Sequence, residues 1–163
     1  MSDDLRELYQ EVILDHSKRP RNFKALPGAN RSAQGYNPLC GDKETVYLTV
    51  EGDVLKDVSF QGSGCAISTA SASMMTERVK GMTRPQAEAL FQKFHELITS
   101  ASGPKPGGPD LEKLEVFSGV RGYPVRIKCA TLPWHTLKAA MSGAQETVST
   151  ELSEGPKAES GGA

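Results

Sequence analysis

Apolar residues recur at helical spacing near the start of the chain and alternate with polar residues further along it. Residues 5–13 place their apolar side chains three or four positions apart, which predicts an amphipathic helix. Strict alternation over residues 45–50 and 54–60, on either side of Glu51-Gly52-Asp53, predicts a β-hairpin. A weak edge strand is expected near residues 30–34.

Two helices are predicted in the middle of the chain. Residues 66–80 are rich in small side chains and read as one helix, which Gly81 ends. Thr83-x-x-Gln86 is a capping-box pattern, and Pro85 suits the first turn of a second helix. The apolar face of this second helix is formed by Ala87, Leu90, Phe94, Leu97 and Ile98.

Two more helices are expected nearer the end of the chain. Asp110 is placed to cap a short helix that includes Leu114 and Phe117. The last helix carries an apolar face of Trp134, Leu137 and Met141. Pro133 has no N–H to donate to the preceding turn, so this helix is expected to begin close to Ala130 or Thr131.

The net charge and the short apolar runs of the chain argue against nucleic acid and membranes as partners. The 163 residues include 19 Lys and Arg and 20 Asp and Glu, so the formal net charge is −1. A chain without a strong positive field is not expected to be a dedicated nucleic-acid binder. Its apolar runs are too short for a transmembrane helix, and its acidic start does not resemble a secretory signal, so no membrane association is expected.

The end of the chain differs in composition from the rest. Residues 143–163 contain four Glu, one Lys and four Gly but almost no large apolar side chain. Such a segment cannot bury enough apolar surface to offset the entropy lost on ordering. We therefore expect one domain over residues 1–142 and a flexible acidic tail over residues 143–163, weakly helical at first and disordered from about Ser153.

Three cysteines carry the candidate chemistry, and each stands beside a structure breaker or a predicted helix start. Cys40 precedes Gly41 on a loop, Cys65 precedes the helix of small residues, and Cys129 precedes the predicted last helix. Helix starts favour anions and so lower thiol pKa values. A small, odd number of cysteines favours metal or thiol chemistry in a reducing cytoplasm over a disulfide framework.

Asp42 adds a carboxylate two residues from Cys40. Three thiolates and one carboxylate would complete a four-coordinate zinc site, formed by Cys40, Asp42, Cys65 and Cys129. The residues alone leave a second interpretation open, because no Cys-x-x-Cys pair is present and a free cysteine is also a common buried apolar side chain.

Four motifs follow one another along the chain. They are Leu8-Tyr9…His16 with Arg19-Pro20-Arg21-Asn22, then Asn37-Pro38-x-Cys40-Gly41-Asp42, then Gly62-x-Gly64-Cys65-Ala66-Ile67-Ser68, and then Arg126-x-Lys128-Cys129-Ala130-Thr131-Leu132. Together they resemble the IscU/NifU-type iron–sulfur cluster assembly family over about residues 5–142. The resemblance implies a compact α+β domain with a small three-stranded antiparallel sheet, about five helices and a metal site at one exposed end.

Two features resemble the SufU branch of that family. Scaffold-type members carry a His immediately before the third cysteine, where this chain has Lys128. They also lack an extra segment between the second and third cysteines, which residues 99–119 resemble. The SufU branch binds zinc and accepts persulfide sulfur from a cysteine desulfurase. Lys128 argues against a scaffold role, because an iron–sulfur cluster on this chain would need a fourth ligand in place of the missing His.

The resemblance also implies roles for individual residues. A partner side chain replaces Cys40 on zinc, and the freed Cys40 thiolate accepts the sulfur. The partner implied is a SufS-type, pyridoxal-phosphate-dependent cysteine desulfurase, with downstream SUF assembly proteins as recipients. Arg126, three residues before Cys129, either steadies the freed thiolate or the partner's acidic groups, or forms an ordinary surface ion pair.

Two other functions stay open from the sequence. One is a scaffold that holds iron or a [2Fe–2S] cluster on the same three cysteines. The other is a zinc-stabilised protein that only activates the desulfurase and carries no sulfur.

Overall fold

The computed structural model describes residues 3–104, 107–143 and 147–149. Three antiparallel strands form most of its sheet: β1 (Arg31–Asn37), β2 (Asp42–Glu51) and β3 (Val54–Ser63). The strand order is β3-β2-β1-β4, so β2 lies in the middle of the antiparallel part. The three-stranded antiparallel sheet is confirmed. The strand expected near residues 30–34 is β1, but its expected place at an edge is wrong, because β4 pairs with its other side.

A short strand, β4 (Thr147–Ser149), extends the sheet by pairing parallel to β1. The sequence predicts weak helix in this segment, and that prediction is wrong for these three residues. The free edge of β1 offers unpaired backbone groups that a local composition pattern does not reveal. The disorder expected from about Ser153 lies outside the described residues.

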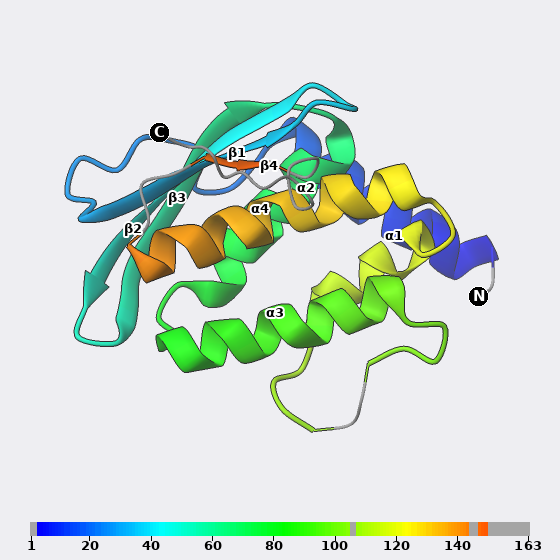
Figure 1. The fold of residues 1–163 in the computed structure, drawn as a ribbon. Helices are drawn as coiled ribbons and strands as arrows, with labels where there is room; N and C mark the ends of the chain where they lie inside the picture. The colour runs from blue at the N-terminus through cyan, green and yellow to red at the C-terminus, as the bar shows by residue number, and fades with distance from the viewer. Residues whose placement is uncertain (1–2, 105–106, 144–146, 150–163) are drawn as a thin grey trace, which may run out of the picture.

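Five helices accompany the sheet in the described part of the chain (Figure 1). They are α1 (Asp3–Lys18), α2 (Ala66–Val79), α3 (Arg84–Thr99), the 3₁₀ helix η1 (Glu112–Val120) and α4 (Pro124–Ser142). α2 and α4 pack directly on the sheet, whereas α1 packs on α2 and η1, and α3 packs on η1 and α4. The α+β architecture with about five helices is confirmed.

Local signals set several of these boundaries. Thr83 caps α3 by accepting a hydrogen bond from the Gln86 N–H, and the Gln86 side chain accepts one from the Thr83 N–H. This is the predicted capping box. The cap expected at Asp110 is wrong: the helix that follows is 3₁₀, its cap residue is Leu111, and no side chain caps it, although Asp110 Oδ1 accepts a hydrogen bond from the Glu112 N–H.

α4 begins at Pro124, well before the start expected at Ala130 or Thr131, and it contains Pro133 in its interior. Pro124 suits the first turn because its missing N–H has no partner there in any case. Pro133 cannot donate the helical hydrogen bond to the preceding turn. Burial of this part of α4 offsets the loss, since Trp134 stacks there on Phe94 with ring centroids 4.9 Å apart. Cys129 therefore lies inside α4, and its expected place before the helix start is wrong.

Small side chains let α2 and α4 approach one another. Ser71 Oγ donates a 2.6 Å hydrogen bond to the Ala130 carbonyl and accepts one from Trp134 Nε1 at 3.1 Å. Gly35 has the same role on the sheet, because any side chain there would overlap Thr136 of α4. The small residues of the helix predicted over residues 66–80 are thus explained by close packing. No helix in the described ranges is both long and apolar enough to cross a membrane.

His16 joins α1 to α2 and gives the fold a pH dependence. Its Nδ1 lies 2.7 Å from Ser73 Oγ, and burial lowers its pKa from the ordinary value. Because the pKa of His16 is lower in the folded state, its contribution to folding stability is fully present above about pH 6.5. That contribution is lost as the pH falls from there through the folded-state pKa. Thermal melts between pH 8 and pH 5 are expected to show this loss in the unmodified chain and a smaller one in His16→Gln. Equal losses would contradict the assignment.

Candidate metal centre

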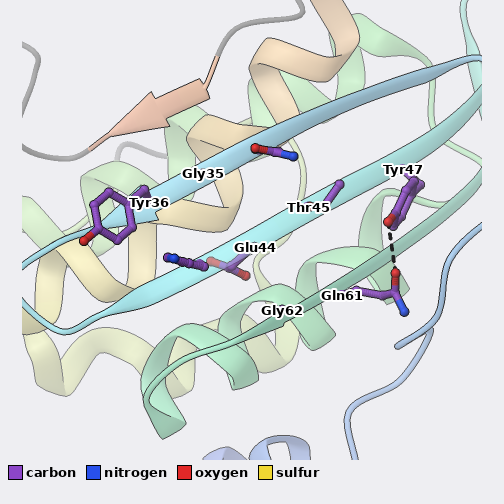
Figure 2. A pocket seen from close by; sticks show the side chains of 9 residues that line it. Gly35, Tyr36, Glu44, Thr45, Tyr47, Gln61 and Gly62 are labelled. Carbon is purple, nitrogen blue, oxygen red and sulfur yellow. Dashed lines mark hydrogen bonds between the residues drawn. The ribbon is translucent and has the colours of Figure 1, made fainter.

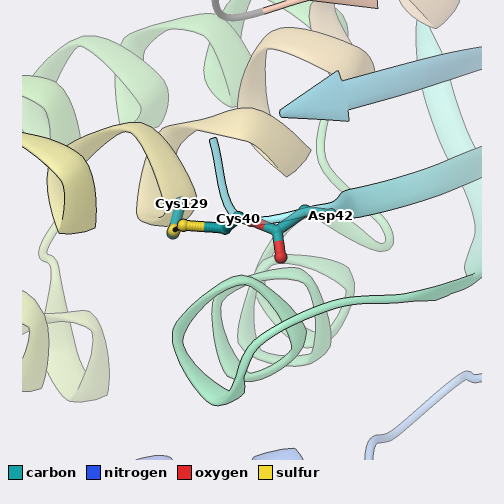
Figure 3. Close-up of side chains that lie close together, drawn as sticks. All are labelled: Cys40, Asp42 and Cys129. Carbon is teal, nitrogen blue, oxygen red and sulfur yellow. Dashed lines mark hydrogen bonds between the residues drawn. The ribbon is translucent and has the colours of Figure 1, made fainter. Parts of the chain in front are cut away.

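Three side chains from two distant segments converge at one end of the sheet. Cys40 lies in the β1–β2 turn, Asp42 begins β2 and Cys129 lies in α4 (Figure 3). Their sulfur and oxygen atoms all lie within 4.8 Å of one another, and the Cys40 and Cys129 sulfurs are 3.1 Å apart. The structure thus brings together three of the four residues expected to hold a metal.

The β1–β2 turn is shaped by a glycine and an asparagine. Gly41 has φ of 70°, a left-handed conformation that a side chain would strain. Asn37 is fully buried; its Oδ1 accepts from the Leu39 N–H, and its Nδ2 donates to Asp42 Oδ2 at 3.2 Å. Nδ2 also lies 3.5 Å from the Cys129 sulfur, so one amide links the turn to α4. Sequence reasoning quoted Asn37 within a motif but assigned it no role.

Cys65 reaches the same centre from α2. It is the residue that caps this helix, and its sulfur accepts a 3.5 Å hydrogen bond from the Ser68 N–H. Its own N–H donates to Asp42 Oδ1 at 2.8 Å. Gly64 makes this approach possible, because a side chain there would collide with Asp42 and Ser68. The predicted position of Cys65 at a helix start is confirmed.

The thiols of Cys65 and Cys129 interact directly. A hydrogen bond from Cys129, aided by the Ser68 N–H, lowers the Cys65 pKa to about 6. The same hydrogen bond raises the pKa of Cys129, which is buried and also lies against Cys40. Of these two thiols, Cys65 is therefore the one more readily ionised. It stands just outside the compact group of Cys40, Asp42 and Cys129, and contacts that group through Cys129 and Asp42.

The donor set fits a zinc ion. Tetrahedral zinc with sulfur ligands at about 2.3 Å requires sulfurs about 3.8 Å apart, so the Cys40–Cys129 pair has to open by less than about 1 Å. Thiolates with one carboxylate suit zinc or iron better than the oxygen-seeking Mg²⁺ and Ca²⁺. Among the described residues, no histidine belongs to this group.

Arg126 does not take part in the cluster. It is exposed on the first turns of α4 and forms no hydrogen bond or ion pair with any described residue. Its neighbour Lys128 is only half-exposed and does have an interaction partner. The surface ion pair considered for Arg126 is therefore absent from the described residues.

Glu44 was missed by sequence reasoning. It lies two residues after Asp42 on the same, inward face of β2 and is only 5% exposed. Burial, and then the charges of Asp42 and Cys65, raise its pKa well above the ordinary value. The alternation of β2 contains the signal, because Glu44 occupies an inward position in line with Val46, Leu48 and Val50.

A separate pocket of about 590 Å³ lies on the outer face of the sheet (Figure 2). Most side chains that line it are polar, and one of them, Tyr47, donates a 2.9 Å hydrogen bond to its neighbour Gln61 (Figure 2). None of its lining residues is a cysteine or a histidine. The cysteine-bearing turn, not this pocket, is thus the place for metal or thiol chemistry.

Comparison with known proteins decides the family. A family model described as the NifU-like N terminal domain matches residues 8–130, about three quarters of the chain. The chain belongs to this NifU-like family.

Two relatives match this chain along nearly their whole length. The iron–sulfur cluster assembly scaffold protein IscU of Streptococcus pyogenes is 39% identical over 154 residues, covering 93% of this chain and 95% of the relative. The zinc-dependent sulfurtransferase SufU of Bacillus subtilis is 37% identical over 139 residues, covering 85% and 92%. The chain is thus a member of the IscU/SufU group of iron–sulfur cluster assembly proteins.

Solved structures agree with the NifU-like fold. A candidate cluster assembly scaffold for the SUF system from Fervidobacterium islandicum superimposes with a TM-score of 0.73 at 33% identity, covering 83% of this chain and 98% of that one. The N-terminal part of a NifU-like protein from Brucella abortus gives a TM-score of 0.75 at 24% identity, covering 85% and 95%. The second likeness shows the fold alone.

Proposed function

We propose that this chain is a zinc-binding sulfurtransferase that accepts persulfide sulfur on Cys40 from a cysteine desulfurase and passes it on for iron–sulfur cluster assembly. The observation that carries the proposal is the unequal anchoring of the three cysteines. Cys40 is half-buried in a turn next to Gly41, whereas Cys65 caps α2 and Cys129 is buried inside α4. Cys40 is therefore the thiol best able to leave a metal and meet a partner.

Four residues would hold the metal: Cys40, Asp42, Cys65 and Cys129. Bound zinc would keep the cysteines deprotonated at neutral pH, which is the chemistry it supplies here. Asn37 holds Asp42 and Cys129 in place through its amide, and the Cys65 N–H holds the other Asp42 oxygen. These contacts orient the donors before any metal arrives.

Sulfur transfer itself is thiol exchange. The Cys40 thiolate attacks the outer sulfur of the partner's cysteine persulfide, and a new S–S bond forms on Cys40. The bond between the two partner sulfurs breaks, and the partner's cysteine leaves as a thiolate, so no external oxidant or reductant is consumed. A partner side chain that takes the place of Cys40 on the metal, as the family resemblance implies, would free the attacking thiolate.

The surroundings of the site suit a docked desulfurase of the SufS type. Leu39, Tyr123 and Val125 are exposed apolar side chains on the segments that carry Cys40 and Cys129. Exposed apolar side chains gathered near a reactive group are typical of a protein interface. Arg126 stands on the same turns of α4 and is assigned the role of steadying the freed thiolate or an acidic group of the partner.

A scaffold function is the second candidate, because close relatives from Streptococcus pyogenes and Thermotoga maritima carry the name IscU scaffold protein. Lys128 favours the sulfurtransferase, since an ammonium group is a poor ligand where a scaffold has His. A third function, activation of the desulfurase without sulfur transfer, uses the same zinc site. Free cysteines in a chain of this family suit the reducing cytoplasm, which is the location we propose.

Metal analysis separates the sulfurtransferase from the scaffold. Freshly purified protein is expected to be colourless and to contain about one zinc per chain. Elemental analysis together with an absorption spectrum checks this. A brown protein with visible iron–sulfide bands and little zinc would favour the scaffold instead.

A further inference from the structure

Cys129 is a fully buried thiol inside α4, and its reach is limited to groups of this chain. Its sulfur lies 3.1 Å from the Cys40 sulfur, and the two side chains point toward one another (Figure 3). The same sulfur contacts Cys65 and the Asn37 amide. A thiol without access to solvent cannot meet a partner's cysteine or a small thiol directly. Any thiol chemistry of Cys129 is therefore directed at Cys40 or Cys65.

The distance between the Cys40 and Cys129 sulfurs suits bond formation as well as metal binding. Two sulfurs that share a zinc ion are about 3.8 Å apart, and two sulfurs in a disulfide are about 2 Å apart. The observed 3.1 Å lies between these values, so the pair has to close by only about 1 Å to form a bond. Cys40 can supply that movement, because it lies in the β1–β2 turn, whereas Cys129 is fixed in a helix.

Cys65 is placed less well for a reaction with Cys40. Its sulfur caps α2 by accepting a hydrogen bond from the Ser68 N–H, and it lies outside the compact group of ligand atoms that contains the Cys40 and Cys129 sulfurs. The Asn37 amide, in contrast, links the turn to the Cys129 sulfur at 3.5 Å. Cys129 is therefore the thiol that faces Cys40.

We propose that Cys129 is a resolving cysteine, which releases the outer sulfur of a Cys40 persulfide as sulfide when the metal is absent; this inference rests on the proposed function. The Cys129 sulfur attacks the inner sulfur of the persulfide anion, which is the Cys40 sulfur itself, and a Cys40–Cys129 disulfide forms. The bond between the inner and outer sulfurs breaks. Its electron pair stays with the outer sulfur, which takes the Cys129 proton and leaves as HS⁻.

The electrons of this step balance within the chain. The outer sulfur is reduced to sulfide, and the two cysteine sulfurs are oxidised to the disulfide, so no outside oxidant or reductant is consumed. A dithiol reductant later opens the disulfide and restores both thiols.

Cys129 does not react in this way while it is a metal ligand. In the proposed zinc site its sulfur electron pair is engaged with the metal, so a Cys40 persulfide persists until an acceptor takes its sulfur. Loss of the metal frees the Cys129 sulfur beside Cys40. A metal-free chain thus discards its sulfur instead of carrying it.

Removal of zinc from a sulfur-loaded chain tests the proposal. The unmodified, zinc-containing chain is loaded by a SufS-type desulfurase with cysteine, separated from both, and treated with a chelator in the absence of oxygen and added thiols. Chelation is expected to release sulfide in an amount equal to the loaded sulfur and to join the Cys40 and Cys129 peptides by a disulfide. A colorimetric sulfide assay and mass spectrometry of the alkylated peptides measure the two products.

The outcomes of this experiment separate the two proposals. Sulfur that stays on Cys40 after chelation would overturn the resolving role of Cys129 and leave the proposed function intact. A disulfide between Cys40 and Cys65 would also overturn that role alone. A chain that the desulfurase never loads on Cys40 would overturn the proposed function and this inference together.

Two serine variants provide matched controls, because both are expected to lack zinc. Cys65→Ser keeps the Cys40–Cys129 pair, whereas Cys129→Ser breaks it. Both are loaded with inorganic polysulfide, which needs no desulfurase, and are then freed of excess reagent. Cys65→Ser is expected to release sulfide and form the disulfide. Cys129→Ser is expected to hold its sulfur and to release sulfide at least about tenfold more slowly, because no positioned thiol remains.

Cys129→Ala repeats the comparison with an apolar side chain that suits the buried position. It is expected to hold its sulfur as Cys129→Ser does. Equal rates of sulfide release from Cys65→Ser and from both Cys129 variants would overturn the proposal.

Discussion

Replacing Cys40 with alanine is expected to reduce the stimulation of a SufS-type cysteine desulfurase by this chain to background. Cys40 is a half-buried thiol in the turn, and the other two cysteines are fixed in α2 and α4, so we expect neither of them to take its place as the mobile nucleophile. The variant should remain folded, because the buried core lies elsewhere. Alanine formation from cysteine, measured with the unmodified chain and with Cys40→Ala, checks the expectation.

Asp42→Ala provides the contrast for this prediction. It removes a proposed metal ligand and an acceptor for the Cys65 N–H but leaves the Cys40 thiol intact. We expect weaker metal binding together with residual, less selective sulfur acceptance. Full stimulation by Cys40→Ala would contradict a sulfur relay through this residue and would support the role of a non-catalytic activator.

Replacing Cys129 or Cys65 with serine is expected to abolish zinc binding and to lower the melting temperature strongly. Zinc that binds only the folded chain contributes about 4 kcal/mol when its free concentration is 1,000 times its Kd. For a chain of this size, that corresponds to roughly 8–16 °C. Differential scanning calorimetry with parallel zinc analysis measures both effects.

Chelation supplies the internal control for the serine variants. A chelator should bring the melting curve of the unmodified chain down towards those of Cys65→Ser and Cys129→Ser, and should leave the variants unchanged. If chelation removes zinc and the unmodified chain melts as before, the metal does not stabilise the fold and this prediction fails.

Local chemistry explains what could be predicted from the sequence. The capping box of Thr83 and Gln86 and the alternation on either side of Gly52 act over a few residues, so their patterns fix the start of α3 and the β2–β3 hairpin. The position of Cys65 at the start of α2 was likewise predictable from its local sequence. Asp42 stands two residues from Cys40, and its closeness to that thiol followed from the spacing.

Non-local packing explains what the sequence did not predict. Pro133 looks like a helix breaker, but burial of α4 overrides its lost hydrogen bond, and Cys129 consequently lies inside the helix. The orphaned carboxylate of Glu44 depends on a strand register that sets glycines on both sides of it. The bond between Asn37 and Cys129 joins residues that are 92 positions apart. The alternation of β2 indicates the inward position of Glu44, but the other features have no local sequence pattern.

The most direct test of the account is to locate the transferred sulfur. The full chain is incubated with a SufS-type cysteine desulfurase and cysteine, its free thiols are alkylated, and its peptides are analysed by mass spectrometry. The account predicts one added sulfur on the peptide that contains Cys40, with Cys65 and Cys129 carrying none. Sulfur on Cys65 or Cys129 with Cys40 unmodified would contradict it.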